Sequence, residues 1–299
     1  MHLNEDVLSN TKYKTYSQES EKNKNHSLNF IFSLLRYLKI YFRRSRKKGS
    51  YYSKVIDNAF DNYDENPWIK SHRLNIEINK LSLSSKRLFQ NNLMSNSLAS
   101  DWLLPITFIC NSSSLNKKTV NVMDFAGGTG ISYFTMKPYL FEPERVNYKV
   151  IDVNKSLLEL GKKHSIKTNS KSNITFDSKL PDHRKYQPDI IFVNTALQYL
   201  KNPYETLNTF FRYKPKYIIL TRLIAGSIPE YYTIQYVLGT KTRCKILNIE
   251  KLNAHIELND YNLILKAENI GENLYYQCDN NIPEERRIKN TINLIYIRN

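Results

Sequence analysis

The second half of the chain alternates short β-rich runs with segments of helical character. This alternation begins at Thr119, after the polar stretch NSSSLNKK has broken the preceding pattern. Strands that alternate with helices predict an open, mostly parallel α/β sheet, and we expect helices between the first five strands. The predicted strands are VNVMDF (120–125), NYKVID (147–152), NITF (173–176), DIIFVN (189–194), YIILT (217–221), YNLILKA (261–267) and TINLIYI (291–297).

The pattern before this region is helical. Residues 49–115 are expected to form a helical segment that packs on the core, with its helices at 53–60, 71–89 and 97–109. The α/β domain is then predicted to occupy residues 116–299.

Residues 28–48, LNFIFSLLRYLKIYFRRSRKK, have the pattern of a basic amphipathic helix. The apolar run is interrupted by Arg36 and Lys39, and it falls short of the roughly 20 apolar residues that cross a bilayer. Such a helix either lies on an anionic membrane surface, through residues 30–48, or packs its apolar face on the protein's own core. The sequence leaves both interpretations open. Residues 1–27 are polar and are predicted to be a disordered tail.

Composition restricts the class of protein without deciding its function. The chain has 299 residues, is 41% hydrophobic and carries a net charge of +16, which is compatible with nucleic-acid binding. An excess of Asn, Lys, Ile and Tyr also explains the Lys content without any such function. Cys110, Cys244 and Cys278 form no C-x-x-C pair, so neither a disulfide framework nor a metal site is predicted. The first 27 residues lack a secretory signal, and we expect a cytoplasmic protein.

The candidate binding turn is DFAGGTG, from Asp124 to Gly130, directly after the first predicted strand. A phosphate-binding P-loop is excluded because Ile131 and Ser132 follow the last glycine, where Lys and Ser or Thr are required. A dinucleotide-binding turn would place its third glycine at Tyr133, where a bulky ring prevents close helix–strand packing.

What remains is the pattern D-x-G-x-G-x-G, with Ala126 at the first glycine, and here the chain resembles the class I S-adenosylmethionine (SAM)-dependent methyltransferases. The resemblance implies a Rossmann-like, seven-stranded sheet with helices on both faces. Asp152 ends the next strand, 22 residues beyond Gly130, at the position where such folds hold both ribose hydroxyls. PDIIFVNTALQYLKNP (188–203) resembles the fourth strand and following turn of the same superfamily.

The resemblance implies SAM as cofactor and S-adenosylhomocysteine (SAH) as product. The free N–H groups at the start of the next helix, from about Ile131, suit the methionine carboxylate, Asp124 supports the loop and the ammonium side, and Asp152 holds the ribose. Asp177 and Ser178, just past the third strand, are candidates to lie beside the adenine, although a solvated turn acid is the slightly better explanation of Asp177. The residues expected at the cofactor are Asp124, Phe125, Ala126, Gly127, Gly128, Thr129, Gly130, Asp152, Val153, Asp177, Ser178, Asn194, Thr195 and Ala196.

Methyl transfer depends mainly on alignment, and no catalytic base stands out in the sequence. Tyr133, His183 and Tyr199 are candidates by chain position, but each also fits a packing or surface role. Arg222 is a candidate for binding an acidic group on the acceptor, or equally a surface ion pair. Thr221 stands before it where an Asp would be usual.

Further segments narrow the resemblance to methyltransferases encoded among genes for lipopolysaccharide and other surface polysaccharides. These segments are GSYYSKVIDNAFDNYD, GISYF, ALQYLKNPY, YIILTR and TIQYV. The implied acceptor is a sugar, a sugar nucleotide or a lipid-linked glycan. Two alternatives stay open: an RNA or DNA methyltransferase, and a non-catalytic module that retains the fold. The nucleic-acid alternative lacks the N/D-P-P-Y/F turn that stacks a flipped base.

Overall fold

The computed structural model describes part of the chain, and all of that part belongs to one compact unit, Ser50–Asn299. The predictions for the tail at 1–27, the amphipathic helix at 28–48 and the helix at 71–89 lie outside the described residues. The described residues are 52–56, 102–115, 119–168, 173–237, 240–269 and 282–299.

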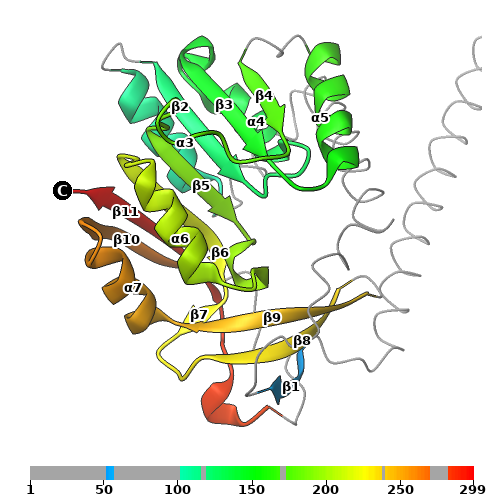
Figure 1. The fold of residues 1–299 in the computed structure, drawn as a ribbon, viewed down its shortest axis with the longest axis vertical. Coiled ribbons are helices and arrows are strands. Elements are labelled where there is room, and N and C mark those ends of the chain that lie inside the picture. Colours follow the sequence, from blue (N-terminus) through cyan, green and yellow to red (C-terminus); the bar gives the residue numbers. More distant parts are fainter. Residues whose placement is uncertain (1–51, 57–101, 116–118, 169–172, 238–239, 270–281) are drawn as a thin grey trace, which may run out of the picture. The chain divides into compact units, whose positions relative to one another are not determined.

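The seven predicted strands form one sheet in the order β10-β11-β6-β5-β2-β3-β4, which confirms the predicted fold class (Figure 1). Pairing is parallel from β6 through β4, and β11 is antiparallel to both of its neighbours. The strands are β2 (Val120–Phe125), β3 (Val146–Ile151), β4 (Ile174–Asp177), β5 (Ile190–Asn194), β6 (Tyr217–Leu223), β10 (Tyr261–Asn269) and β11 (Thr291–Arg298).

Helices cover both faces of this sheet. Successive side chains of a strand point to opposite faces, so the apolar residues of the strands are buried under helices on both sides. Val122 packs with the helices of one face, whereas Met123 packs with those of the other. The first face carries α3 (Leu104–Ser114), α4 (Ile131–Met136) and α5 (Lys155–Lys167), and the second carries α6 (Pro203–Arg212) and α7 (Ile249–Glu257). Short 3-10 helices are η2 (Lys137–Tyr139), η3 (Pro143–Arg145), η4 (Leu197–Tyr199) and η6 (Glu284–Arg286).

Three helix predictions differ from the structure. Residues 178–189, between β4 and β5, form turns rather than a helix, and Pro181 and Pro188 lie within this stretch. The helix expected at 97–109 is α3, which begins at Leu104 with Pro105 in its first turn and continues to Ser114. The helix expected at 53–60 is wrong over its first residues, where β1 (Tyr52–Ile56) is a strand.

A second sheet, in the order β1-β8-β9-β7, was not predicted. It consists of β1 together with β7 (Ala225–Gly226), β8 (Tyr231–Val237) and β9 (Thr240–Asn248), so most of it is inserted between β6 and α7. Figure 1 shows β8 and β9 as a long yellow-orange hairpin that follows β6 in the chain. β1 pairs antiparallel with β8, across about 180 residues of sequence, which is why local pattern alone misassigned it.

None of the helices in the described ranges is long and apolar enough to span a membrane.

Candidate functional site

The glycine loop, residues 126–130, connects β2 to α4. Its backbone enters the left-handed region at Ala126 (φ 58°), Gly128 and Gly130 (φ 72°), and the Gly130 N–H donates to the Gly127 carbonyl at 3.0 Å. A Cβ at Gly130 would lie 2.8 Å from Ile174 Cδ1, so both conformation and space require glycine there. Ala126 occupies a left-handed position without being glycine, which makes it a strained point of the loop.

Asp124 lies beneath the loop. Its side chain is buried, and its Oδ2 accepts a hydrogen bond from the Tyr148 hydroxyl at 2.8 Å. A Cβ at Gly127 would meet the Asp124 carboxyl group at 2.5 Å, so loop and carboxylate are in direct contact. Burial, and next the Asp124 charge, raise the pKa of Tyr148 well above its usual value. The geometry therefore gives Asp124 the loop-supporting part of its expected role.

Asp152 follows β3 and joins the glycine loop to the start of α5. Its Oδ2 accepts the Gly128 N–H at 2.9 Å, and its Oδ1 accepts the Asn154 N–H at 2.8 Å. Asn154 is in turn the N-cap of α5, with its side chain accepting the Leu157 N–H. Asp152 is only 3% exposed, whereas the neighbouring Val153 is 74% exposed. Each carboxylate oxygen has two lone pairs, so an oxygen of this group can accept more than one donor.

The ends of the flanking strands lie at the same edge. The Asp152 N–H donates to the Asp177 carbonyl at 3.1 Å, which puts the end of β4 beside Asp152. Asp177 itself is exposed and its Oδ1 accepts the Lys179 N–H, while Ser178 is half-buried. Asp177 is therefore an exposed turn carboxylate beside Asp152.

Asn194 closes the other side of the site at the end of β5. Its Oδ1 accepts hydrogen bonds from the hydroxyls of Thr195 at 3.0 Å and Thr221 at 3.2 Å. Thr195 has a positive φ of 55°, and Ala196 after it is buried. Thr221, which stands where an acid was expected, thus ties the ends of β5 and β6 together.

These residues gather at the topological switch point of the sheet. β3 and β4 lie on one side of β2, whereas β5 and β6 lie on the other, so the strand order reverses between β2 and β5. In sheets of this kind, ligands bind beyond the carboxyl ends of the strands at that point. Phe125, at the end of β2, packs edge-to-face on Phe210 of α6 with ring centroids 5.0 Å apart. The structure brings the predicted cofactor residues together at this edge.

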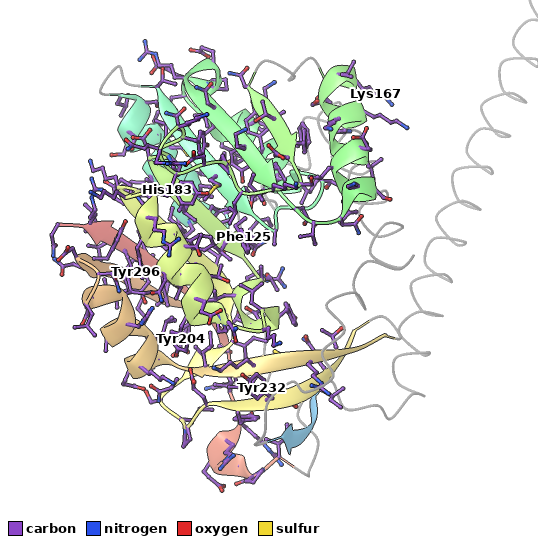
Figure 2. All side chains as sticks on the ribbon, in the orientation of Figure 1. Phe125, Lys167, His183, Tyr204, Tyr232 and Tyr296 are labelled. Atoms are coloured by element: carbon purple, nitrogen blue, oxygen red, sulfur yellow. The ribbon has the colours of Figure 1, made fainter. Side chains whose placement is uncertain are left out.

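Of the four catalytic candidates, one is a buried core residue and one lies at the opposite edge of the sheet. Tyr133 is fully buried in the core between Phe134 and Tyr148, and burial raises the pKa of its hydroxyl to about 12. His183 lies in the loop before β5, near the ring of Tyr213, the residue that ends α6. Because α6 runs antiparallel to the strands that it connects, its C-terminal end, and His183 with it, lies at the amino-terminal edge of the sheet. Figure 2 labels His183 near one end of α6 and Tyr204 near the other.

The other two candidates lie beyond the carboxyl edge. Tyr199 belongs to η4, directly after β5, and its hydroxyl donates to Gln235 Oε1 of the hairpin at 2.6 Å. Arg222 lies at the end of β6 with a positive φ of 52°, and its backbone N–H donates to the buried Asn293 side chain at 2.9 Å. Its carbonyl accepts from Gln198 Nε2. A non-glycine residue in this conformation is held there by its surroundings.

Sequence reasoning missed Gly161 and Tyr148. A Cβ on Gly161 of α5 would lie 2.4 Å from Phe176 and 2.6 Å from the Thr129 carbonyl, so glycine lets this helix contact the loop. A glycine inside a helical pattern can indicate close packing, and this could have drawn attention to Gly161. Nothing in the sequence pairs Tyr148 with Asp124.

The residues of the β8–β9 hairpin were missed as well. The run YYTIQYV, which is β8, alternates apolar and polar side chains with the period of two that is typical of a strand. Lys245 of β9 forms an ion pair with Glu230 at 3.1 Å, and its ammonium lies over the rings of Tyr204 (5.2 Å) and Tyr232 (5.5 Å). Figure 2 labels these two tyrosines, one on α6 and one on β8. The Tyr204 hydroxyl also donates to Glu230, so this group, called the Lys245 anchor below, attaches the hairpin to α6.

Within the described ranges, no three His, Cys, Asp or Glu side chains are grouped so that they could hold a metal ion.

No protein-family model and no curated protein matches the chain. Solved structures resemble it in fold. A 1,6-didemethyltoxoflavin-N1-methyltransferase from Burkholderia thailandensis, with its substrate and SAH bound, is 10% identical with a TM-score of 0.47, over 82% of this chain and 94% of that one. A magnesium protoporphyrin IX methyltransferase from Synechocystis PCC 6803 with bound SAH is 10% identical with a TM-score of 0.42, over 66% and 81%.

The cyclase SpnF is 12% identical with a TM-score of 0.40, and the match covers 57% of this chain and 61% of the cyclase. The chain therefore spans about three fifths of that protein. At these identities the similarities concern the fold, and the activity has to be argued from the site itself.

Proposed function

We propose that the protein is a SAM-dependent methyltransferase. The observation that carries this proposal is the hydrogen bond from the Gly128 N–H to the Asp152 carboxylate at the switch point of the sheet. This bond joins the glycine loop to the acid that we assign to the ribose. Asp152 then accepts the ribose hydroxyls, and the N–H groups at the start of α4 face the methionine carboxylate.

Methyl transfer from SAM requires few further catalytic groups from the protein. The sulfonium of SAM supplies an activated methyl group, and the protein contributes alignment of the acceptor at near-attack distance. Tyr199 and Arg222 are the two candidates that lie on the correct edge, after β5 and β6. Tyr199 is hydrogen-bonded to Gln235, which suits a role in positioning the acceptor.

The acceptor in this proposal is a sugar, a sugar nucleotide or a lipid-linked glycan of surface-polysaccharide assembly. Its support is the sequence resemblance, together with the basic amphipathic pattern of residues 30–48, which suits contact with the membrane that carries such acceptors. Co-sedimentation of the full chain with vesicles that contain or lack anionic lipid tests that contact.

Calorimetric titration with SAH tests the cofactor. Wild-type protein is expected to bind SAH, and Asp152→Ala to bind it at least tenfold more weakly, because the ribose hydroxyls and the Gly128 N–H both lose their acceptor. Asp182→Ala, a matched change at the opposite edge of the sheet, should leave the affinity unchanged. No heat with wild type, or equal affinity in Asp152→Ala, would refute the cofactor assignment.

Labelled SAM tests the acceptor. Purified protein is incubated with the host's sugar nucleotides, polysaccharide intermediates and bulk RNA, and the labelled species is identified by mass. Label in a glycan fraction supports the proposal. Label in RNA with none in glycans would favour the nucleic-acid alternative.

One observation favours a second function, a non-catalytic module that retains the fold. Asp152 is only 3% exposed and both of its oxygens already accept backbone N–H groups. A module of this kind would give no heat with SAH, so the same titration separates the two functions.

A further inference from the structure

The hairpin and η4 carry a group of buried side-chain oxygens without partners. Within the described part of the chain, five buried side-chain N or O atoms make no hydrogen bond, and three of them are Gln198 Oε1, Thr233 Oγ1 and Thr242 Oγ1. The other two, on Tyr133 and His164, lie beside Phe134, in the core under α4 and α5. Buried polar groups in folded proteins nearly always have partners, so three exceptions on η4 and the hairpin call for a cause.

The hairpin residues of this group share one face. Thr233 pairs with Cys244, and Gln235 pairs with Thr242, in the antiparallel register of β8 and β9. Opposite residues, and residues two apart along a strand, point to the same side of a sheet. The hydrogen bond from Tyr199 to Gln235 shows that η4 lies against this side. Gln198, next to Tyr199 in η4, is fully buried as well.

This face adjoins the proposed methyl-donor site. η4 follows the end of β5, and the hairpin follows the end of β6, so both lie beyond the carboxyl ends of the switch-point strands. Gln198 also donates through Nε2 to the Arg222 carbonyl at the end of β6. The unpaired oxygens are therefore carried by elements that leave the same edge as the glycine loop and Asp152.

The polar side chains of this face are uncharged, and beside them Tyr231, Cys244 and Ile246 pack with Ile282 and Ile288 in a small apolar cluster. Two hydroxyls can donate and accept, and the Gln198 oxygen only accepts. The charged Lys245 is one residue from Cys244 in β9, so its side chain points to the other face, where Glu230 and two tyrosine rings neutralise it. A charged ligand group would find no counter-charge among these residues, whereas a ligand with several hydroxyls would satisfy every unpaired oxygen.

We infer that Gln198, Thr233 and Thr242, with Tyr199 and Gln235, form the acceptor subsite, and that it takes an uncharged, hydroxyl-rich group such as a neutral sugar ring. The inference rests on the proposed methyl transfer, and it assigns the acceptor-binding residues to the inserted hairpin. Since the three oxygens are buried, ligand entry separates η4 from the hairpin and breaks the Tyr199–Gln235 hydrogen bond.

Binding of simple sugars to the full chain tests the subsite. The probes are methyl glycosides of glucose, galactose and N-acetylglucosamine, with glucuronate and glucosamine as charged counterparts, measured by saturation-transfer NMR in the presence of SAH. Thr233→Val and Thr242→Val remove a hydroxyl with little change of shape. Thr175→Val, on the exposed side of β4, is the matched control.

We expect a neutral glycoside to bind, and each hairpin variant to weaken that binding at least fivefold while SAH affinity stays unchanged. The melting temperature of the hairpin variants should equal or exceed that of wild type, because an unpaired buried hydroxyl is lost. This combination of lower affinity and undiminished stability is not expected of a structural hydroxyl.

Three results overturn the inference. One is that no neutral glycoside binds, and another is that a charged probe binds better than its neutral counterpart. The third is that the hairpin variants melt at a lower temperature and bind the probe normally, which would indicate that a buried water satisfies the hydroxyls. Each of these results with SAH binding intact leaves the proposed function standing, whereas loss of SAH binding in wild type refutes the proposed function.

Discussion

The glycine-loop region and the inserted hairpin differ in how their buried polar atoms are satisfied. Around the loop, Asp152 accepts two backbone N–H groups and Asp124 accepts the Tyr148 hydroxyl. On the inner face of the hairpin, Thr233 and Thr242 bury hydroxyls that have no partner in the described chain. The first region is preorganised by its own backbone, whereas the second carries hydrogen-bonding capacity that the protein leaves unused.

The hairpin is nevertheless firmly attached by its other face. There the Lys245 anchor holds β8 and β9 to α6 through Glu230 and two tyrosine rings. One face of the same hairpin therefore serves attachment, and the other is the face that we assign to the acceptor. The following substitutions separate these contributions.

The largest effect is expected from Gly161→Ala, which disrupts the packing behind the glycine loop. The new Cβ would overlap the Phe176 ring and the Thr129 carbonyl, and a backbone oxygen cannot rotate away. We expect a loss of about 2–3 kcal/mol in the free energy of unfolding, together with weaker SAH binding. Urea denaturation measures the first quantity. Lys163→Ala, on the exposed side of the same helix, should be close to wild type, and equal stability of the two variants would show that this packing is unimportant.

A smaller loss is expected from Glu230→Gln, which breaks the Lys245 anchor. Lys245 keeps its charge but loses its carboxylate in a setting where both side chains are largely buried. We expect a loss of about 1–2 kcal/mol, less than for a fully buried pair because the anchor is partly open to solvent. The exposed pair Glu159–Lys162 provides the control, and its disruption by Glu159→Gln should not change stability measurably.

The stability difference between wild type and Glu230→Gln should depend on pH. Burial alone would raise the pKa of Glu230, but hydrogen bonds from Tyr204, Lys245 and Lys251 outweigh it and hold the pKa below its ordinary value of 4.5. Because the folded-state pKa is lowered, this stabilisation is present above pH 4.5 and is lost as the pH falls further. The stability difference between wild type and Glu230→Gln should therefore shrink below about pH 4.5. A difference that stays constant down to pH 3 would contradict the anchor.

The seven strands of the main sheet were predictable because each is a short β-rich run separated from the next by helical or turn residues. Asp124, Gly128 and Asp152 were predictable for a related reason, since a strand end fixes where the next side chains lie. The hairpin and β1 were not predicted, because β1 pairs with a strand about 180 residues away. Two of the catalytic candidates were chosen by chain position alone. Chain position does not show at which edge of the sheet His183 lies. It also does not show whether the ring of Tyr133 is packed in the core or exposed at the rim of the site.

The smallest effect is expected from Ala126→Gly, which relieves strain within the loop. Ala126 has φ 58°, a conformation that costs a non-glycine residue about 1 kcal/mol. Glycine removes that cost but increases the entropy of the unfolded chain, so a net gain of about 0.5 kcal/mol is expected. Ala254→Gly, on the exposed side of α7, makes the same change at an ordinary helical position and should lose about 1 kcal/mol. If both variants are less stable than wild type, Ala126 is not strained.

Hydrogen exchange of the full chain, with and without SAH, tests most directly the claim that the loop region holds the cofactor and the hairpin does not. The Gly128 N–H is bonded to Asp152, so both sides of that contact report on the site. We predict that SAH slows exchange in residues 126–130 and 152–154 and leaves residues 231–237 unchanged. Slower exchange in the hairpin alone, or no change in the loop at saturating SAH, would contradict the account.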